Sequence, residues 1–302
     1  MRLTAGGDAV IELAPEVTDA RRDGGPIVAL ETTLVAHGFL DGEGFDVALE
    51  AERRVREAGA VPATIGIVDG DVRVGLSEAE LERFASAGDT ARKVGPRDLA
   101  TAVTQGALGA TTVGGTLAVC ALVGIRFMGT GGIGGVHRRF AERPDVSADL
   151  GELARTPALV VASGVKSILD VPATVEALET LGVPVLGWRT ETLPLFYSAV
   201  GGPPVPAVVQ TESEAAAVAR THWSLGRAGL LLARPPAQSL DVEPLIEAAL
   251  AEAAAKHVTR QEVTPFVLAH IHRATGGESV RVNKQLIADN AALAAEVAVA
   301  AA

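Results

Sequence analysis

The sequence predicts an α/β protein, with a three-layer α/β/α arrangement around a mainly parallel or mixed central sheet. Two observations predict this class: short apolar runs recur along the chain, and segments with helical periodicity lie between them. The apolar runs expected to form strands lie at residues 26–30, 64–68, 125–129, 159–162, 184–187 and 229–233. Because no internal repeat divides this alternation, we expect residues 1–302 to form a single domain.

Two capping boxes indicate where helices begin. Ser77 is followed three positions later by Glu80, and Thr211 by Glu214, so that each hydroxyl can accept from a free N–H group of the first turn. Composition predicts further helices at residues 243–257 and 283–302, and a loop at the Gly/Pro-rich residues 201–206.

The bulk composition limits the kinds of partner. A net charge of −11 argues against a general nucleic-acid binder, because such binding needs clustered cations. No apolar run reaches about 18 residues, so no transmembrane helix is expected. The N-terminal stretch lacks the hydrophobic region of a secretory signal, and the lone Cys120 forms no intrachain disulfide. These features predict a cytoplasmic protein, and they do not exclude one anionic small molecule held by a few local groups.

Lysines are rare in this chain. Only four of its 26 basic residues are lysines, and the rest are arginines, which form no imine with a carbonyl compound. Lys256 and Lys284 lie in polar, helix-like sequence and are expected to be solvated. Lys166 follows an apolar run and a glycine, so we expect it at the end of a buried strand. Lys93 is expected in a loop, because the Gly-Pro pair just after it opposes a helix.

The glycine-rich segment at residues 129–138 contains the pattern G-x-G-x-x-G after a predicted strand. A dinucleotide site would need a helix that begins inside the pattern and an acidic residue at the end of the next strand, and neither follows here. We interpret the segment as a cradle in which backbone N–H groups converge on a phosphate. His137, within it, is a candidate base or phosphate donor, with a structural role as the alternative.

Three further sets of polar residues interrupt apolar sequence. Glu31 follows the first predicted strand, where burial would raise its pKa and suit it to a general acid; a helix cap is the alternative. Asp145, Ser147 and Asp149 could bind a hard divalent cation or cap the following helix. Asn283 and Asn290, in the last predicted helix, could read the edge of a nucleobase if an amide faces a site; the alternative is that they have no functional role.

Longer motifs occur in the order typical of a known family. They are IVALETTLVAHG, AVPATIGIVDG, VGLSEAELE, RKVGPRDLA, GATTVGGT, GTGGIGGVHR, DVSADL, GVKSILDVPATVEALETLGVPVLG and TPFVLA. From about residue 10 to 300 the chain resembles the pseudouridine-5′-phosphate glycosidases, also called the indigoidine synthase A-like family.

The resemblance implies an enzyme of the pseudouridylate synthase type, a carbon–oxygen lyase that reversibly cleaves pseudouridine 5′-phosphate to uracil and ribose 5-phosphate. The bond to be broken joins two carbons, and carbon is a far worse leaving group than the oxygen of ordinary glycosides. In the family the sugar ring opens and a lysine captures C1′ as an imine. Uracil then departs after protonation at C5, and water releases ribose 5-phosphate. Lys166 matches the lysine nucleophile and Glu31 the proton donor.

The resemblance also implies binding residues. Asp145 matches the position that holds a divalent cation, usually Mn²⁺ with Mg²⁺ as an alternative, and Lys93 matches a lysine that contacts the substrate. The other positions expected to bind substrate are Thr112, Val113, Thr130, Gly131, Gly132, His137, Ser147, Ala148, Asp149 and Asn290. The family fold is a three-layer α/β/α arrangement, and its members look like homotrimers.

Three segments depart from the common family pattern: Gly114-Gly115, the loop at residues 39–45, and Trp188-Arg189. Each could alter the base side of the pocket, and the two glycines would make room for a larger ring. The main alternative function is therefore a related C-glycosynthase that joins ribose 5-phosphate to an aromatic natural-product carbon. A sugar or nucleoside kinase and a non-catalytic sugar-phosphate sensor are further alternatives, although the chain lacks the P-loop pattern G-x-x-x-x-G-K-[ST].

Overall fold

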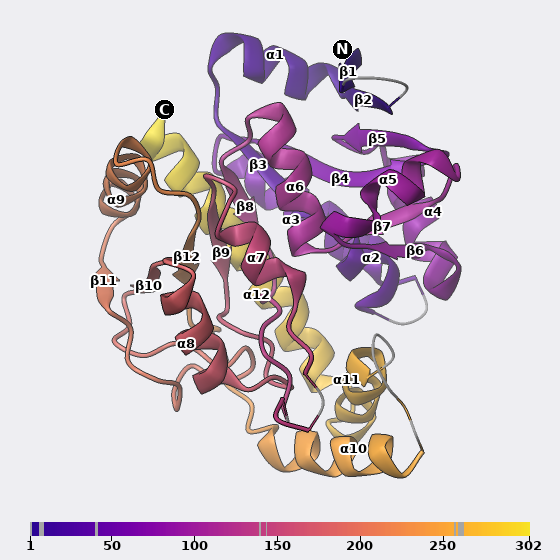
Figure 1. Cartoon of the computed structure of the whole chain (residues 1–302), viewed down its shortest axis with the longest axis vertical. Helices are drawn as coiled ribbons and strands as arrows, with labels where there is room; N and C mark the ends of the chain where they lie inside the picture. Colours follow the sequence, from indigo (N-terminus) through magenta and orange to yellow (C-terminus); the bar gives the residue numbers. More distant parts are fainter. Residues whose placement is uncertain are drawn as a thin grey trace.

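A mixed β-sheet runs through the middle of the molecule, and helices cover both of its faces (Figure 1). The computed structural model describes residues 2–5, 9–39, 42–138, 140–142, 144–256, 258 and 263–302. Within these ranges the sheet has 12 strands.

The centre of the sheet is entirely parallel. Its strands, in spatial order, are β4 (Val61–Val68), β3 (Ile27–Glu31), β8 (Phe127–Gly129), β9 (Leu159–Ala162), β12 (Leu230–Ala233), β10 (Val185–Trp188) and β11 (Ala207–Val209). Every residue of β3 and β9 is buried, because helices cover both faces, and such strands read as continuous apolar runs. All six predicted strands are confirmed, with small shifts at their ends.

The other edge of the sheet is mixed. It adds β1 (Arg2–Ala5), β2 (Ala9–Leu13), β5 (Asp71–Val74), β6 (Arg92–Val94) and β7 (Gly109–Thr111). β5 and β7 both pair with β4 in the antiparallel sense, while β6 pairs with β7 in parallel. The loop predicted around Lys93 was therefore wrong: Lys93 lies in the short strand β6, and the turn begins only at the Gly-Pro pair after it.

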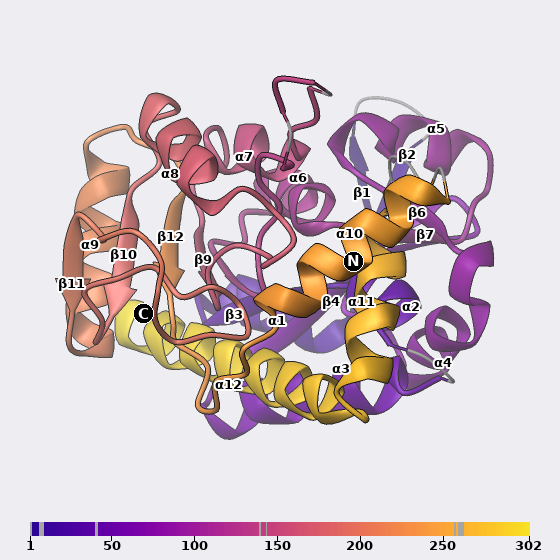
Figure 2. The same cartoon turned by 90° about the horizontal axis from the view of Figure 1, so that it is seen from below.

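The helices form the two outer layers, which Figure 2 shows edge-on. One face carries α6 (Val113–Val123), α7 (Ala148–Leu153) and α8 (Val171–Thr180), and the other carries α3 (Gly44–Glu57), α9 (Glu212–Ser224) and α12 (Glu278–Ala301). The remaining helices are α1 (Pro15–Asp23), α2 (Thr33–His37), α4 (Glu78–Ala87), α5 (Leu99–Thr104), α10 (Glu243–Ala255) and α11 (Val263–Ala274). This arrangement confirms the predicted three-layer α/β/α class. None of the helices in the described ranges combines the length and apolar character needed to cross a bilayer.

The predicted helix starts are mostly confirmed. Ser77 caps α4 with a complete capping box, in which Glu80 returns a bond to the backbone N–H of Ser77. At α9 the hydroxyl of Thr211 accepts from the backbone N–H of Glu214, but the Glu214 carboxylate accepts from Gln210 instead of closing the box. The last helix begins at Glu278, earlier than the predicted residue 283, and α10 ends at Ala255, short of the predicted residue 257, which lies outside the described ranges.

α12 lies unusually close to the centre of the sheet. It contacts β3, β8 and β9 along its length. A Cβ atom on Gly129, at the end of β8, would lie 2.8 Å from the Cα of Ala291. Glycine on the strand and alanine on the helix therefore set this close spacing, since any larger residue at position 129 would push α12 away.

The glycines after β8 are also required by packing. A Cβ atom on Gly135 would lie 2.3 Å from Oγ1 of Thr174 in α8. That oxygen is fixed in place, because it donates to the carbonyl of Asp170 and accepts from the backbone N–H of Val136.

We expect Gly135→Ala to lower the free energy of unfolding by about 1–3 kcal/mol, because the added methyl group meets an atom that has no freedom to move. Chemical denaturation followed by circular dichroism measures the change. Gly151→Ala is the matched control: its Cβ atom would meet only the mobile tip of Arg155, at 3.4 Å. We expect that helical substitution to be neutral or to stabilise by up to about 1 kcal/mol. Equal effects of the two substitutions would contradict this account of Gly135.

Candidate active site

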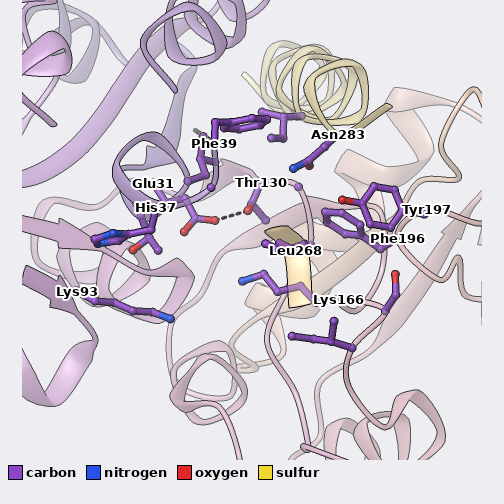
Figure 3. A pocket seen from close by; sticks show the side chains of 18 residues that line it. Glu31, His37, Phe39, Lys93, Thr130, Lys166, Phe196, Tyr197, Leu268 and Asn283 are labelled. Carbon is purple, nitrogen blue, oxygen red and sulfur yellow. Dashed lines mark hydrogen bonds between the residues drawn. The ribbon is translucent and has the colours of Figure 1, made fainter. Parts of the chain in front are cut away.

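A cavity opens where the carboxyl ends of β3, β8 and β9 meet, and Figure 3 shows the side chains around it. Its empty space, the open mouth included, is about 780 Å³. Its polar lining consists of Glu31, Thr33, His37, Lys93, Thr130, Lys166, Ser167, Tyr197 and Asn283. Its apolar and glycine lining consists of Leu34, Gly38, Phe39, Gly131, Gly132, Ile168, Phe196, Leu268 and Ile287.

The parallel sheet explains why residues far apart in sequence meet here. Glu31 is the last residue of β3, and Thr130 follows β8 directly. Lys166 follows β9 after a turn in which Gly164 has a φ of +76°, a conformation that favours glycine. The carboxyl ends of parallel strands lie at one edge of a sheet, where open α/β folds place their ligands. Of the predicted site residues, this edge brings together Glu31, Lys93, Thr130, Gly131, Gly132 and Lys166.

Glu31 is a buried carboxyl, only 4% exposed. The hydroxyl of Thr130 donates a hydrogen bond to its Oε1 atom, with a distance of 2.5 Å between the oxygens. Burial raises the pKa of Glu31, and the nearby Lys166 and the Thr130 bond only partly oppose this. The predicted direction of the shift is confirmed, so Glu31 keeps its proton to a higher pH than an exposed glutamate.

Two lysines face the same cavity. Burial lowers the pKa of Lys93, and the positive charge of Lys166 lowers it further, while Asp149 and Glu31 oppose the shift. Lys166 is half-buried, and within the described ranges its Nζ atom has no hydrogen-bond or ion-pair partner. Its backbone is fixed, because its N–H donates to the carbonyl of Ile133. The Lys166 side chain thus extends from a fixed backbone and lines the same cavity as the Glu31 carboxyl.

His37, which the sequence analysis did not single out, also lines the cavity. It ends the short helix α2, and its Nε2 atom is buried without a partner among the described residues. Burial lowers the pKa of His37, and Lys93 lowers it further, so the imidazole is neutral near pH 7. A neutral imidazole can donate or accept at Nε2, depending on its tautomer.

The glycine-rich segment offers backbone donors to the cavity. The N–H groups of Gly131 and Gly132 donate to no protein group in the described ranges, while that of Gly134 donates to Asp149 at 2.9 Å. Packing also requires glycine here, since a Cβ atom on Gly132 would lie 2.6 Å from the Phe196 ring. The expected anion cradle is therefore reduced to two available donors, at Gly131 and Gly132.

Ser147 and Asp149 have structural roles in the protein. The sequence had left open whether they cap a helix or bind a cation. The Ser147 hydroxyl caps α7 by accepting from the backbone N–H of Asp149. The Asp149 carboxylate is buried and accepts from the N–H groups of Gly114 and Gly134, at 2.8 and 2.9 Å. It thereby ties the start of α6 to the glycine-rich segment. A direct contact of these residues with substrate stays a prediction.

The other predicted binding positions lie outside the cavity lining. Thr112 caps α6 by accepting from the N–H of Gly115, and Val113 is buried behind it. Ala148 is exposed at the start of α7. His137 lies near the charged groups of the cavity. Burial lowers its pKa most, Lys93 and Lys166 lower it further, and Asp145 opposes the shift.

The predicted metal position, Asp145, lies at the surface. Its side chain is 49% exposed, and its Oδ2 atom lies 3.9 Å from Nε2 of His137. No group of three or more His, Cys, Asp or Glu side chains within the described ranges could hold a metal ion. Among the described residues Asp145 forms no ion pair with a lysine or arginine, so its carboxylate could meet a cation completed by water or substrate oxygens; that metal site stays a prediction.

Two asparagines on α12 have different surroundings. Asn290 is completely buried, and its Nδ2 atom donates to the carbonyl of Thr130 at 2.8 Å and to the hydroxyl of Ser163 at 3.1 Å. It ties the two loops of the site to the helix and does not line the cavity. Asn283, about two turns earlier on the same helix, does line the cavity. Its Oδ1 atom is buried without a partner among the described residues. The Oδ1 atom of Asn290 is likewise buried without a partner among the described residues, so a contact of Asn290 with a base stays a prediction.

The three departures from the family pattern have different outcomes. A Cβ atom on Gly115 would lie 2.4 Å from the carbonyl oxygen of Val94, and one on Gly114 would lie 3.1 Å from the Asp149 carboxylate. Protein fills the space beside both glycines, so they make no room for a larger ring. Trp188 is buried under Arg189 and lies outside the cavity lining. In the loop at residues 39–45, Phe39 lines the cavity, while residues 40 and 41 lie outside the described ranges.

Comparison with known sequences gives a consistent result. A sequence profile described as indigoidine synthase A like protein matches residues 16–300. A pseudouridine-5′-phosphate glycosidase of Herpetosiphon aurantiacus is 48% identical over 294 residues, which cover 95% of this chain and 97% of that protein. Another, from Salinispora tropica, is 50% identical over 294 residues, which cover 95% of this chain and 90% of that protein.

Solved structures agree with this relationship. The prealnumycin C-glycosynthase AlnA, in complex with ribulose 5-phosphate, is 38% identical and superposes with a TM-score of 0.88 over 98% of each chain. An indigoidine synthase A-like protein from Thermotoga maritima is 36% identical, with a TM-score of 0.88 over 98% of each chain.

We expect Thr130→Val to move the alkaline limb of the pH profile of kcat/KM to higher pH. The Thr130 hydroxyl stabilises the ionised form of Glu31, so its removal raises the pKa of Glu31 further. An activity that needs protonated Glu31 is present below that pKa and is lost as the pH rises through it. Thr33→Val is the control, because the Thr33 hydroxyl also lies at the cavity but donates to the carbonyl of Ala110. An alkaline limb that stays in place, or moves to lower pH, would argue against Glu31 as the titrating acid.

Substitution of the two asparagines should affect the stability of the protein to different extents. We expect Asn290→Ala to lower the free energy of unfolding by about 1–3 kcal/mol, because it leaves buried acceptors without their donor. Asn283→Ala should change it by less than about 1 kcal/mol, since it removes no protein hydrogen bond and alanine favours helix. Thermal denaturation of both variants measures the difference. A larger loss of stability in Asn283→Ala than in Asn290→Ala would contradict these roles.

Proposed function

Because the chain belongs to the indigoidine synthase A like family, we propose that it acts as a pseudouridine-5′-phosphate glycosidase. The reaction is the reversible cleavage of the C–C glycosidic bond to give uracil and ribose 5-phosphate. The single observation that carries the chemistry is the amino group of Lys166, which has no partner among the described residues and shares a cavity with the buried carboxyl of Glu31.

The chemistry explains why a lysine is needed. Uracil leaves from carbon, so protonation of a leaving oxygen offers no route to cleavage. Once the sugar ring has opened, Nζ of Lys166 forms a bond to C1′. Uracil C5 then takes a proton, and the bond between C1′ and C5 breaks, leaving an iminium at C1′. Water hydrolyses the iminium to ribose 5-phosphate and the free amine.

Glu31 supplies the proton for ring opening. Its raised pKa keeps it protonated when the substrate arrives, and its place at the end of β3 puts it on the same cavity wall as Thr130. After donating to the ring oxygen, the carboxylate is stabilised by the Thr130 hydroxyl and by the charge of Lys93. It can then return a proton in a later step, as general acids do in reverse.

The two ends of the substrate meet different surroundings. Lys93 and the free N–H groups of Gly131 and Gly132 suit the anionic sugar phosphate. Phe39, Leu268 and Phe196 suit the faces of a flat base, and the Asn283 amide suits its polar edge. The complex of AlnA with ribulose 5-phosphate supports a pentose phosphate as the sugar component in a chain of this fold.

The proposal extends to a cofactor and an assembly. Asp145, with His137 nearby, would hold Mn²⁺ or Mg²⁺, and the cation would supply positive charge close to the anionic substrate. The family resemblance further implies a homotrimer located in the cytoplasm. Light scattering after size-exclusion chromatography tests the trimer, and activity with and without a chelator tests the cation.

AlnA also supports a second candidate, a C-glycosynthase that joins ribose 5-phosphate to an aromatic natural-product carbon. Both reactions use the same lysine chemistry and differ in the aglycone. The aglycone accepted by the Lys166 adduct therefore decides between them.

We expect sodium borohydride to trap ribose 5-phosphate on Lys166 as a reduced adduct, which peptide mass mapping identifies. Added uracil should decrease trapping and produce pseudouridine 5′-phosphate. Lys166→Arg should lose turnover by more than about 10³-fold, because arginine forms no imine. Lys256→Arg, at an exposed lysine that pairs with Glu252, is the matched control and should keep full activity.

The alternatives give different results in the same experiment. An adduct that persists with uracil, but is consumed by an aromatic acceptor, would indicate the C-glycosynthase. Tight binding of ribose 5-phosphate without an adduct, unchanged in Lys166→Arg, would indicate a sensor and overturn the imine mechanism.

A further inference from the structure

Tyr197 has a buried hydroxyl group in the wall of the candidate active site. It is the only tyrosine in the sequence, and its side chain is 1% exposed. Its hydroxyl oxygen has no hydrogen-bond partner among the described residues. Buried hydroxyl groups nearly always have a partner, so an orphan in a ligand cavity points to a partner that the protein chain does not supply.

The surrounding structure holds this ring firmly. The backbone carbonyl of Tyr197 accepts from the N–H of Leu240 at 2.8 Å, and the N–H of Phe196 donates to the carbonyl of Ser163 at 2.9 Å. The rings of Phe196 and Tyr197 pack edge to face, with centroids 4.8 Å apart. Because Ser163 and Lys166 lie on the same loop after β9, these contacts tie the backbone of Phe196 and Tyr197 to the loop that carries the reacting lysine.

Phe196 reaches this position through an unusual backbone. Its φ is +61°, in the left-handed region that residues other than glycine rarely adopt. The conformation places its ring against Gly132, where a Cβ atom would collide with it. Strained backbone of this kind is typical of functional sites, and here it aims two successive aromatic rings at one cavity.

The hydroxyl points toward the part of the cavity that suits a base. In Figure 3 the Tyr197 ring lies beside Phe196, and its oxygen is turned toward the side that Asn283 lines. The charged groups, Lys93 and Lys166, lie at the other side. Burial raises the pKa of Tyr197, so the group is a neutral hydroxyl that keeps its proton. The Tyr197 hydroxyl can therefore donate a hydrogen bond, and it has no role as a base.

We propose that the Tyr197 hydroxyl donates a hydrogen bond to a carbonyl oxygen of the aglycone and thereby selects an aglycone that carries such an oxygen at its edge. This inference rests on the proposed function and specifies the aglycone of that same site. Tyr197 and Asn283 then read the polar edge of a flat ring, while Phe39 and Phe196 contact its faces. An aglycone without the matching oxygen would leave the buried hydroxyl unpaired, which is how a buried polar group rejects a wrong substrate.

Tyr197→Phe tests the proposal, because it removes one oxygen and keeps the ring. In the synthetic direction, with saturating ribose 5-phosphate, we expect KM for uracil to rise about tenfold. Borohydride trapping of ribose 5-phosphate on Lys166 should be unchanged, since the sugar is bound at the other side of the cavity. That trapping also shows that the variant is folded. If the role of Tyr197 were purely structural, the substitution would impair both uracil use and borohydride trapping.

Thiouracils identify the acceptor atom. Sulfur is a weak acceptor, so either 2-thiouracil or 4-thiouracil should bind the wild-type protein about tenfold more weakly than uracil. Tyr197→Phe should abolish that particular discrimination. As Tyr197 is the only tyrosine, 3-fluorotyrosine labelling gives a single ¹⁹F resonance, which should shift when uracil joins ribose 5-phosphate and stay in place with ribose 5-phosphate alone.

The outcomes separate this inference from the function on which it rests. A wild-type protein that makes no pseudouridine 5′-phosphate from uracil and ribose 5-phosphate overturns both. Wild-type activity with an unchanged uracil KM in Tyr197→Phe, or with thiouracil discrimination that survives the substitution, overturns only the role of Tyr197.

Discussion

The site depends on the buried amide of Asn290 and on the close contact of α12 with the end of β8. The amide donates to the Thr130 carbonyl and the Ser163 hydroxyl, so one side chain joins the loops that follow two neighbouring strands. Thr130 in turn holds Glu31, and the Ser163 loop leads to Lys166. Gly129 makes this possible, since only glycine lets the helix approach the strand closely enough. The acid and the amine are therefore positioned by the same helix, although neither lies on it.

Electrostatics then gives the positioned groups their chemical states. Burial raises the pKa of Glu31 and lowers those of Lys93 and His37, so in each case it favours the neutral form. Burial raises the pKa of Glu31 by more than the charges of Lys166 and Lys93 lower it. A site in this state can accept an anionic sugar phosphate and still keep a proton available for the ring oxygen.

The sequence predicted the parallel centre of the fold well, because strands buried on both faces appear as continuous apolar runs. It did not predict the shorter strands, which are three to five residues long and include ones with polar side chains such as Lys93; they are β1, β2, β5, β6, β7 and β11. The charged site residues were recognisable from their place at strand ends. Asn283 and Asn290 are about two helical turns apart and lie on the same face of α12, so the sequence does not show which of them lines the cavity. Tyr197 follows no pattern, and its role emerges only from the strained turn at Phe196. Gly114 and Gly115 show the opposite error, since an absent side chain need not leave a space.

The position of α12 in the sequence has a consequence for how the protein is made. β3, β8 and β9 leave the ribosome well before α12, the last helix in the sequence, which covers one apolar face of these strands. Until α12 docks, the nascent sheet exposes that face, a state in which chains aggregate or require chaperones. The same docking step brings Asn290 to the loops of Thr130 and Ser163. Completion of the core and assembly of the site thus coincide, so a chain whose synthesis stops early is at once inactive and recognisable to quality control by its exposed sheet.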